Sequence, residues 1–158
     1  MKKILLTILM LIASVPLWAQ TVTLNGVKYS YGYSDSKGYY AEVYDIVSIP
    51  SSGAITIPSG ITHGSNVYTV KTVTENSFAD LTGLKSVSLP STITRIKYNA
   101  FYNCSDLEQV NIPSGVTSIG TSAFEGCSSL TSIDIPSGVT SIGSSAFQGC
   151  NYRLTSNC

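Results

Sequence analysis

Apolar residues recur along the second half of the chain with a period of 23 residues. Leu, Pro and Cys residues keep the same register as four equally spaced phenylalanines: Phe78, Phe101, Phe124 and Phe147. Self-similarity at a period of roughly 20–50 residues indicates stacked repeats, each packed only against its neighbours. The pattern therefore predicts a solenoid over residues 50–150, with one coil per repeat and about four coils in all.

Within one repeat, the pattern predicts two short strands and a turn. Ile133 and Ile135 alternate with polar residues, as in a strand with one buried face, and Pro136 ends this strand because it lacks an N–H. Residues 139–142 predict a second strand on another wall, and residues 144–149 predict a single helical or 3-10 turn. The residue two positions after each phenylalanine is of a type that tolerates a left-handed backbone: Asp80, Asn103, Gly126 and Gly149.

These repeats resemble a known family. Residues 112–134 read IPSGVTSIGTSAFEGCSSLTSID, and residues 135–150 repeat the same pattern with little change. The pattern resembles the BspA-type leucine-rich repeats of bacterial surface proteins, with matching residues from Ile55 to Cys150. The resemblance implies a β-rich, right-handed leucine-rich-repeat solenoid that is often exported and, in some members, adheres to host proteins. It supplies no catalytic residues.

The first coil contains an insertion. Its distance from Pro58 to Phe78 is nine residues longer than the matching distance in the other coils. The extra residues include a turn-forming cluster from His63 to Asn66, which predicts a β-hairpin over about residues 62–70. We expect His63 to be a solvent-exposed residue at its tip.

Residues 20–49 predict an N-terminal β cap. Asn25-Gly26 is the signature of a tight hairpin turn, and the flanking segments alternate as strands of a β-meander. Coil ends that expose apolar residues need such a cover. Six tyrosines fall between Tyr29 and Tyr44. They either fill this thin sheet or form an aromatic platform for sugar or peptide binding.

The two ends of the chain differ from the repeats. A positive start, an apolar stretch from Ile4 to Val15 and a following Ala19 predict a secretory signal peptide over residues 1–19. The apolar stretch is too short for a membrane-spanning helix, which needs about 20 residues. We therefore expect an exported mature chain without a transmembrane helix, located in the periplasm, on the cell surface or outside the cell. At the other end Arg153 stands where the repeat predicts Leu, so residues 151–158 are expected to form a tail or a truncated repeat.

Composition limits the chemistry that the chain can perform. Nine basic residues balance nine acidic ones, and charged residues make up only 11%, so nucleic acid is not an expected partner. The chain has one histidine, four cysteines without a CxxC pair, and no phosphate-binding, zinc-protease or nucleophile-elbow motif. We therefore expect no enzyme activity, no cofactor and no metal site.

The cysteines follow the repeat. Three of them occupy the position that Leu81 holds in the first coil, which indicates an apolar packing position. Cys104 and Cys127 are therefore expected to be buried thiols, and Cys150 with Cys158 is the one pair considered for a bridge.

Two functions fit the sequence. The first is an adhesin-like recognition protein that binds a protein or glycan of a host or neighbouring cell surface. The second is a structural spacer, or a fragment of a larger modular surface protein, with no ligand of its own. Because interface energy concentrates in Tyr, Trp and Arg, we expect contact at a corner of the second coil and the nearby hairpin. The residues expected there are Arg95, Lys97, Tyr98, Tyr102 and Tyr68.

Overall fold

The protein is built from β-strands. A computed structural model describes residues 20–151 and 153–155, and within these ranges it contains thirteen strands and no helix. No element in the described part could cross a membrane as a long apolar helix. The expected signal peptide, residues 1–19, lies outside the described residues.

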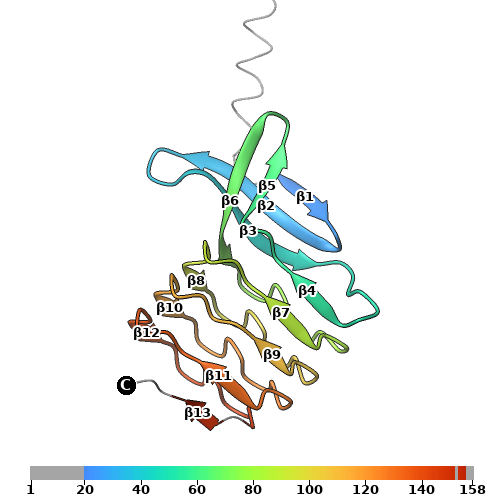
Figure 1. Cartoon of the computed structure of the whole chain (residues 1–158), viewed down its shortest axis with the longest axis vertical. Helices are drawn as coiled ribbons and strands as arrows, with labels where there is room; N and C mark the ends of the chain where they lie inside the picture. Colours follow the sequence, from blue (N-terminus) through green and yellow to red (C-terminus); the bar gives the residue numbers. More distant parts are fainter. Residues whose placement is uncertain (1–19, 152, 156–158) are drawn as a thin grey trace, which may run out of the picture.

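An antiparallel meander of three strands lies at the upper end of the molecule (Figure 1). Its strands are β1 (Thr21–Leu24), β2 (Val27–Ser34) and β3 (Gly38–Ile46). Asn25 and Gly26 connect β1 to β2 with φ angles of 50° and 80°. Two successive left-handed residues are what a two-residue hairpin turn requires, so the hairpin predicted from Asn-Gly is confirmed.

The predicted insertion in the first repeat is also a hairpin. It consists of β5 (Gly60–His63) and β6 (Asn66–Val73), which pair in an antiparallel manner. Beyond the hairpin, β6 pairs in parallel with β3 and so joins the cap to the repeats. The result is sheet A, with strand order β1-β2-β3-β6-β8-β10-β12 and β5 at the side of β6. Its last three strands are β8 (Arg95–Ile96), β10 (Ser118–Ile119) and β12 (Ser141–Ile142).

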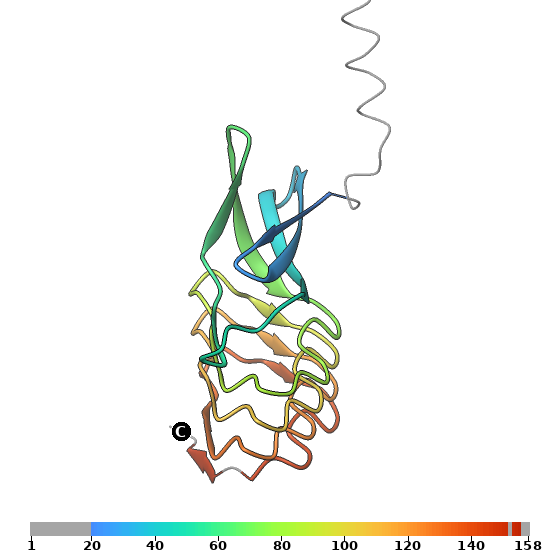
Figure 2. The same cartoon turned by 90° about the vertical axis from the view of Figure 1, so that its right-hand side faces the viewer.

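The repeats stack below the cap and form a second strand wall (Figures 1 and 2). This wall contains β4 (Ala54–Thr56), β7 (Ser86–Ser88), β9 (Gln109–Val110), β11 (Ser132–Asp134) and β13 (Arg153–Thr155). Pairing at an interval of 23 residues, as between Ser86 and Gln109, shows that the sequence period is the stacking period. β13 instead pairs Leu154 with Ile133, so a strand forms where the repeat pattern is lost.

The segments around the phenylalanines are turns, so the predicted helical turn is wrong, although one i→i+3 bond closes each turn, as from Ala79 N–H to Asn76 O at 3.1 Å. Phe78 and Asp80 donate their N–H groups to Ala100 O and Tyr102 O of the next repeat, both at 2.8 Å. These N–H groups are therefore not available for bonds within a helix. Asn76 and Asp80 also have φ angles of 57° and 58°, outside the right-handed helical region. The left-handed backbone two positions after each phenylalanine is confirmed at Asp80, Asn103, Gly126 and Gly149.

Columns of equivalent side chains fill the interior. Phe78, Phe101 and Phe124 are fully buried, and Phe147 is partly buried. Successive rings in this column stack with centroid distances of 4.6, 5.0 and 5.4 Å. Large aromatic side chains contribute much of the apolar burial in a core, so this column is a main source of stability.

The cysteines form a second column. Cys104 and Cys127 are fully buried free thiols, as predicted. Each thiol donates to the carbonyl oxygen of the phenylalanine one repeat earlier, at 2.8 Å for Cys104, 3.1 Å for Cys127 and 3.0 Å for Cys150. Cys150 is partly buried and also unbridged, and Cys158 lies outside the described residues. Burial raises the pKa of the Cys104 thiol to about 12, so this thiol stays protonated at neutral pH.

Candidate functional site

The structure places three of the five predicted binding residues on or beside two different faces of sheet A, and the other two in the turns after β8. Arg95 is exposed on β8, and Lys97 follows two residues later on the same, outer face, because side chains alternate along a strand. Tyr98, which is 49% exposed, and the partly buried Tyr102 lie in the turns after β8. Tyr68 is buried on the inner face of β6. Arg95 and Lys97 are thus brought together, whereas Tyr68 faces the other way.

A β-bulge explains the inward position of Tyr68. Ala41 on β3 pairs with Val70 on β6, but Glu42 pairs with Thr72, so the register shifts by one residue. A bulge of this kind reverses which residues of a strand face the core. Tyr68 therefore shares the inner face with Ala41 and Val70, and Thr72 lies on the outer face with Glu42.

Tyr68 belongs to an aromatic cluster between the hairpin and the meander. Its ring centroid lies 4.8 Å from that of Tyr31 and 5.3 Å from that of Tyr39. Tyr31 also contacts the ring of His63 at 4.9 Å, and Tyr39 contacts Tyr33 at 5.1 Å. Tyr31 and Tyr68 are buried and so fill the sheet, whereas Tyr33, Tyr39 and His63 are exposed at its rim.

A cleft of about 300 Å³ opens on the outer face of sheet A, where the cap meets the repeats. Side chains from β3 and from the segments after β6 and β8 line it, and they include Tyr40, Glu42, Tyr44, Thr74, Glu75 and Lys97. Of the five residues predicted from the sequence, Lys97 alone is among its lining residues. We call this hollow the junction cleft.

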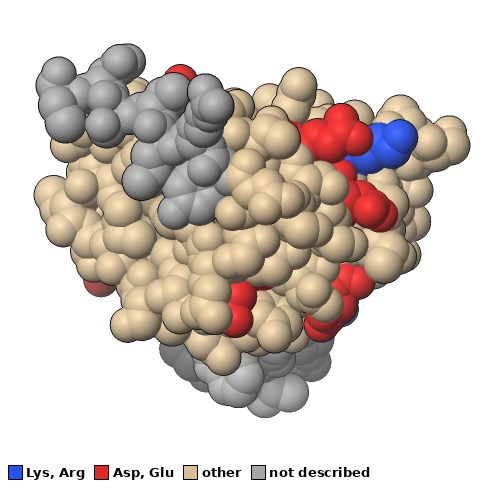
Figure 3. Space-filling model, turned by 90° about the horizontal axis from the view of Figure 1, so that it is seen from below, with Lys and Arg blue, Asp and Glu red and all other residues tan. Residues whose placement is uncertain are grey.

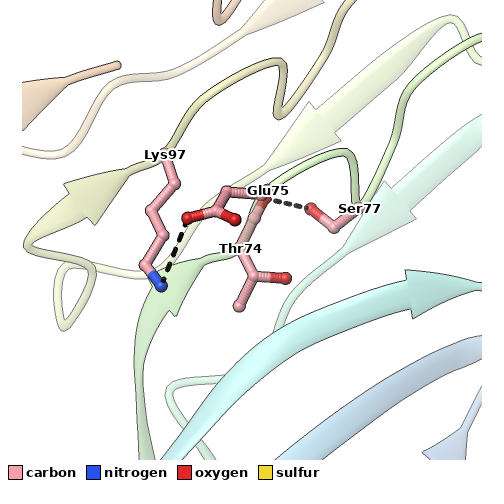
Figure 4. A network of polar contacts seen from close by, with 4 residues as sticks. All are labelled: Thr74, Glu75, Ser77 and Lys97. Carbon is pink, nitrogen blue, oxygen red and sulfur yellow. Dashed lines mark hydrogen bonds and ion pairs between the residues drawn. The ribbon is translucent and has the colours of Figure 1, made fainter. Parts of the chain in front are cut away.

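An ion pair forms one wall of the junction cleft (Figure 4). Lys97 Nζ lies 4.0 Å from Glu75 Oε1, and the two side chains are 38% and 62% exposed. Ser77 Oγ donates to Thr74 O at 3.1 Å and holds the backbone beside the pair. A pair this exposed contributes little to folding, so both charges can interact with a ligand.

Two tyrosines of β3, Tyr40 and Tyr44, also line the junction cleft. Lys37 Nζ lies 4.7 Å from the centroid of the Tyr40 ring, and Lys28 Nζ lies 5.3 Å from that of the Tyr44 ring. Both distances are within the range of cation–π attraction. Sequence reasoning missed Tyr40, Glu42 and Tyr44 as a group. The available signal was their alternation on β3, which places all three on one face.

The second strand wall carries a longer groove, of about 820 Å³. The polar side chains along it are short: Ser86, Ser88, Gln109, Asn111, Ser132 and Asp134. Asn111 already uses its amide group inside the protein, accepting from Leu89 N at 2.7 Å and donating to Leu89 O at 2.8 Å. The groove is larger than the junction cleft, but it lacks the aromatic and basic side chains in which interface energy concentrates.

Reactive chemistry is sparse in the described part of the chain. Within residues 20–151 and 153–155, no three His, Cys, Asp or Glu side chains gather as ligands for a metal ion. The neighbouring Cys150 thiol and burial raise the pKa of Cys127, whereas the neighbouring Cys127 thiol lowers the pKa of Cys150. A protonated, buried thiol is a poor nucleophile, so Cys104 and Cys127 act as packing residues.

The repeats match the model of a known protein family. A family model described as "BspA type Leucine rich repeat region (6 copies)" matches residues 54–156. The chain belongs to this family. Among the curated proteins, none matches the chain.

Solved structures show the same fold. A leucine-rich repeat protein from Bacteroides ovatus is 32% identical over 83% of this chain, with a TM-score of 0.74. A leucine rich cell surface protein from Faecalibacterium prausnitzii is 27% identical over 85% of this chain, with a TM-score of 0.65. A leucine-rich repeat protein from Bacteroides capillosus is 21% identical over 86% of this chain, with a TM-score of 0.72. The matched regions cover 33%, 42% and 99% of those three proteins, so this chain spans about one third of the Bacteroides ovatus protein.

Proposed function

We propose that this chain is an exported, non-catalytic recognition protein that binds a protein or glycan partner at the junction cleft. The observation that carries the proposal is the composition of that cleft, which Tyr40 and Tyr44 line together with the Glu75–Lys97 pair. Aromatic and basic side chains supply most of the energy of protein interfaces. Arg95 and Tyr98 lie beside Lys97 and extend this surface onto the second repeat.

Export is supported by the pattern of residues 1–19 and by the similarity to a protein described as a cell surface protein. Membership of a leucine-rich repeat family, whose members typically present a surface and do not catalyse a reaction, supports the non-catalytic part. The right hand of the solenoid and its count of about four coils remain predictions from the sequence.

A structural spacer is the second candidate, and one observation favours it. The outward residues of the last two repeats are the same, with Ser118 and Gly120 matched by Ser141 and Gly143. A surface that binds a ligand is expected to differ between repeats, whereas a spacer can repeat one pattern. The two candidates therefore make different predictions for the junction cleft.

The test is a binding measurement on an array of extracellular-matrix proteins and purified glycans, with labelled protein that lacks residues 1–19. We expect at least one component to bind, and the double variant Tyr44→Ala with Lys97→Ala to weaken that binding at least about tenfold, as loss of an anchor does. The control is Gln109→Ala with Ser132→Ala, because both residues are exposed on the second wall. Loss of binding in the control alone would move the site to that wall, and no binding to any component would favour the spacer.

A further inference from the structure

The basic residues of the chain are concentrated on one surface. Of the seven Lys and Arg residues after position 19, five lie on or beside the outer face of sheet A: Lys28, Lys37, Lys71, Arg95 and Lys97. Residues 98–151 contain four acidic residues and no basic one. In agreement, the surface seen from below is mainly uncharged, with acidic side chains and little basic character (Figure 3).

Contacts and strand register bring these five residues together from distant parts of the sequence. Lys28 and Lys37 approach the rings of Tyr44 and Tyr40, which line the junction cleft. Lys71 Nζ donates to Lys37 O at 3.1 Å. Arg95 pairs with Thr72 on β6, which pairs in turn with Glu42 of the cleft, and Lys97 lines the cleft itself. We call this surface the basic face.

Four of these five cations, Lys28, Lys37, Lys71 and Arg95, form no ion pair within the part of the protein that the structure describes. The fifth, Lys97, pairs with Glu75. Three further carboxylates lie on or beside this surface: Glu42 in the cleft, Asp45, whose Oδ1 accepts from Ile46 N at 2.8 Å, and Asp35, which is exposed in the same turn as Lys37. Four cations without an ion pair therefore stand beside three carboxylates, so this surface carries a small excess of positive charge.

We infer that the basic face binds an anionic polysaccharide, one whose sugar rings carry carboxylate or sulfate groups. The inference rests on the proposed function and names its ligand class. Arg95 can hold a carboxylate or sulfate through two parallel N–H bonds, and the lysines act as point charges along the chain. The hydroxyl groups of Ser30, Tyr40 and Thr74 line the cleft between them and suit the hydroxyl groups of a sugar.

An extended sugar chain fits this surface better than a compact anion does. The cations come from β2, from the turn before β3, from β6 and from β8, so they are spread across several neighbouring strands of sheet A. Neighbouring strands in a sheet are about 4.8 Å apart. A polymer that crosses the strands can therefore meet several cations in turn, whereas a single phosphate or acetate can meet one or two.

The experiment measures binding of the protein without residues 1–19 to five immobilised probes. They are heparin for sulfate groups, polygalacturonate for carboxylate groups, dextran as a neutral polysaccharide, polyglutamate as an acidic peptide, and single-stranded DNA. We expect heparin, polygalacturonate or both to bind, with an affinity that falls steeply between about 50 and 200 mM NaCl. Dextran, polyglutamate and DNA should bind at least about tenfold more weakly, since they lack either the charge or the sugar hydroxyl pattern.

Three single variants that each remove one positive charge locate the site. Arg95→Gln and Lys71→Gln should each weaken binding to the anionic polysaccharide by at least about threefold, because both lie on the basic face. Lys85→Gln is the matched control, since Lys85 is exposed beside β7 and away from this face. Thermal unfolding of each variant shows that the fold is retained.

Several results would overturn the inference. Equal losses in all three variants would show a response to net charge alone, and polyglutamate or DNA binding as tightly as the polysaccharides would point to another class of partner. Binding to a matrix protein or neutral glycan that depends on Tyr44 and Lys97, without binding to heparin or polygalacturonate, would keep the proposed function and reject this ligand class. Absence of binding to every probe and array component would reject both.

Discussion

Two parts of sheet A, β3-β6-β8 and β10-β12, share a parallel strand arrangement but present different side chains to solvent. On β3, β6 and β8 the outer face carries Tyr, Glu, Lys and Arg, whereas on β10 and β12 it carries serines and glycines. Lys97 is replaced by Gly120 and Gly143 in the next two repeats. A Cβ atom on Gly120 would lie 2.5 Å from backbone atoms of Lys97 and Tyr98, so these repeats pack too closely to admit a side chain there.

This difference suggests that the residues that stabilise the fold and the residues that bind a partner lie in different parts of the molecule. The lower repeats use small residues to bring backbones together and stack their phenylalanines, whereas the boundary between cap and repeats is open enough to form the junction cleft. Substitutions inside the stack should therefore reduce the free energy of unfolding, and substitutions in the cleft should reduce binding with little effect on stability. The following predictions test this separation, from the largest expected effect to the smallest.

Phe101→Ala should destabilise the protein most. Its side chain is fully buried, and its ring stacks between Phe78 at 4.6 Å and Phe124 at 5.0 Å. Removing such a ring costs the transfer energy and leaves a cavity, about 3–5 kcal/mol of unfolding free energy by urea denaturation. Phe147→Ala is the control and should cost less, because Phe147 is only partly buried. Equal losses for the two variants would show that the column does not distribute stability in this way.

Gly120→Ala tests the close approach of successive repeats. The new methyl group would meet backbone atoms of Lys97 and Tyr98, which cannot rotate away as a side chain can. Overpacking of this kind costs roughly 1–3 kcal/mol. Gly115→Ala is the matched control, since its Cβ would lie 3.1 Å from Ser91 O, and it should cost less. An unchanged midpoint of urea unfolding for Gly120→Ala would mean that the lower repeats can separate without cost.

Residues that act within one repeat were predicted well from the sequence. The 23-residue period fixed the buried column of phenylalanines, and the left-handed backbone at Asp80 followed from its residue type. The turns were mispredicted as helical because two features of their backbone cannot be inferred from the sequence of one repeat. The N–H groups of Phe78 and Asp80 bond to the next repeat, and left-handed residues also precede each phenylalanine, at Asn76, Asn99, Ser122 and Ser145. Serine carries no signal for that conformation.

The candidate site was predicted less well, because it depends on pairing between distant strands. Nothing in the local pattern shows that β3 lies beside β6, which places Tyr40 and Tyr44 near Lys97. The bulge that turns Tyr68 inward is likewise a property of the pair of strands. β13 was not predicted because Arg153 interrupts the repeat, and a parallel partner forms the strand nevertheless.

Tyr29→Phe should change how stability depends on pH. Burial raises the pKa of Tyr29 to about 12, so the folded state keeps its proton while the unfolded state loses it above its ordinary value of 10.0. This group's contribution is fully present below pH 10 and is lost as the pH rises toward 12, by about 1 kcal/mol at pH 11. Urea denaturation at pH 7 and pH 11 should show a smaller loss in the variant. The measurement at pH 7 controls for removal of the hydroxyl group, and an identical loss in both proteins would contradict the prediction.

Lys97→Ala should have the smallest effect on folding and so gives the sharpest test of the separation. Lys97 and Glu75 are 4.0 Å apart and well exposed, and pairs of this kind contribute about 0–1 kcal/mol. Urea denaturation at low and high NaCl should therefore give nearly the same unfolding free energy as the parent protein. Lys97→Met is the control, because it keeps the apolar stem of the side chain and removes only the charge. If Lys97→Ala lost more than about 1 kcal/mol and Lys97→Met did not, the stem would be holding the cap against the second repeat. The junction cleft would then be a structural contact as well as a binding surface, and the separation drawn from Gly120 and Gly143 would not hold.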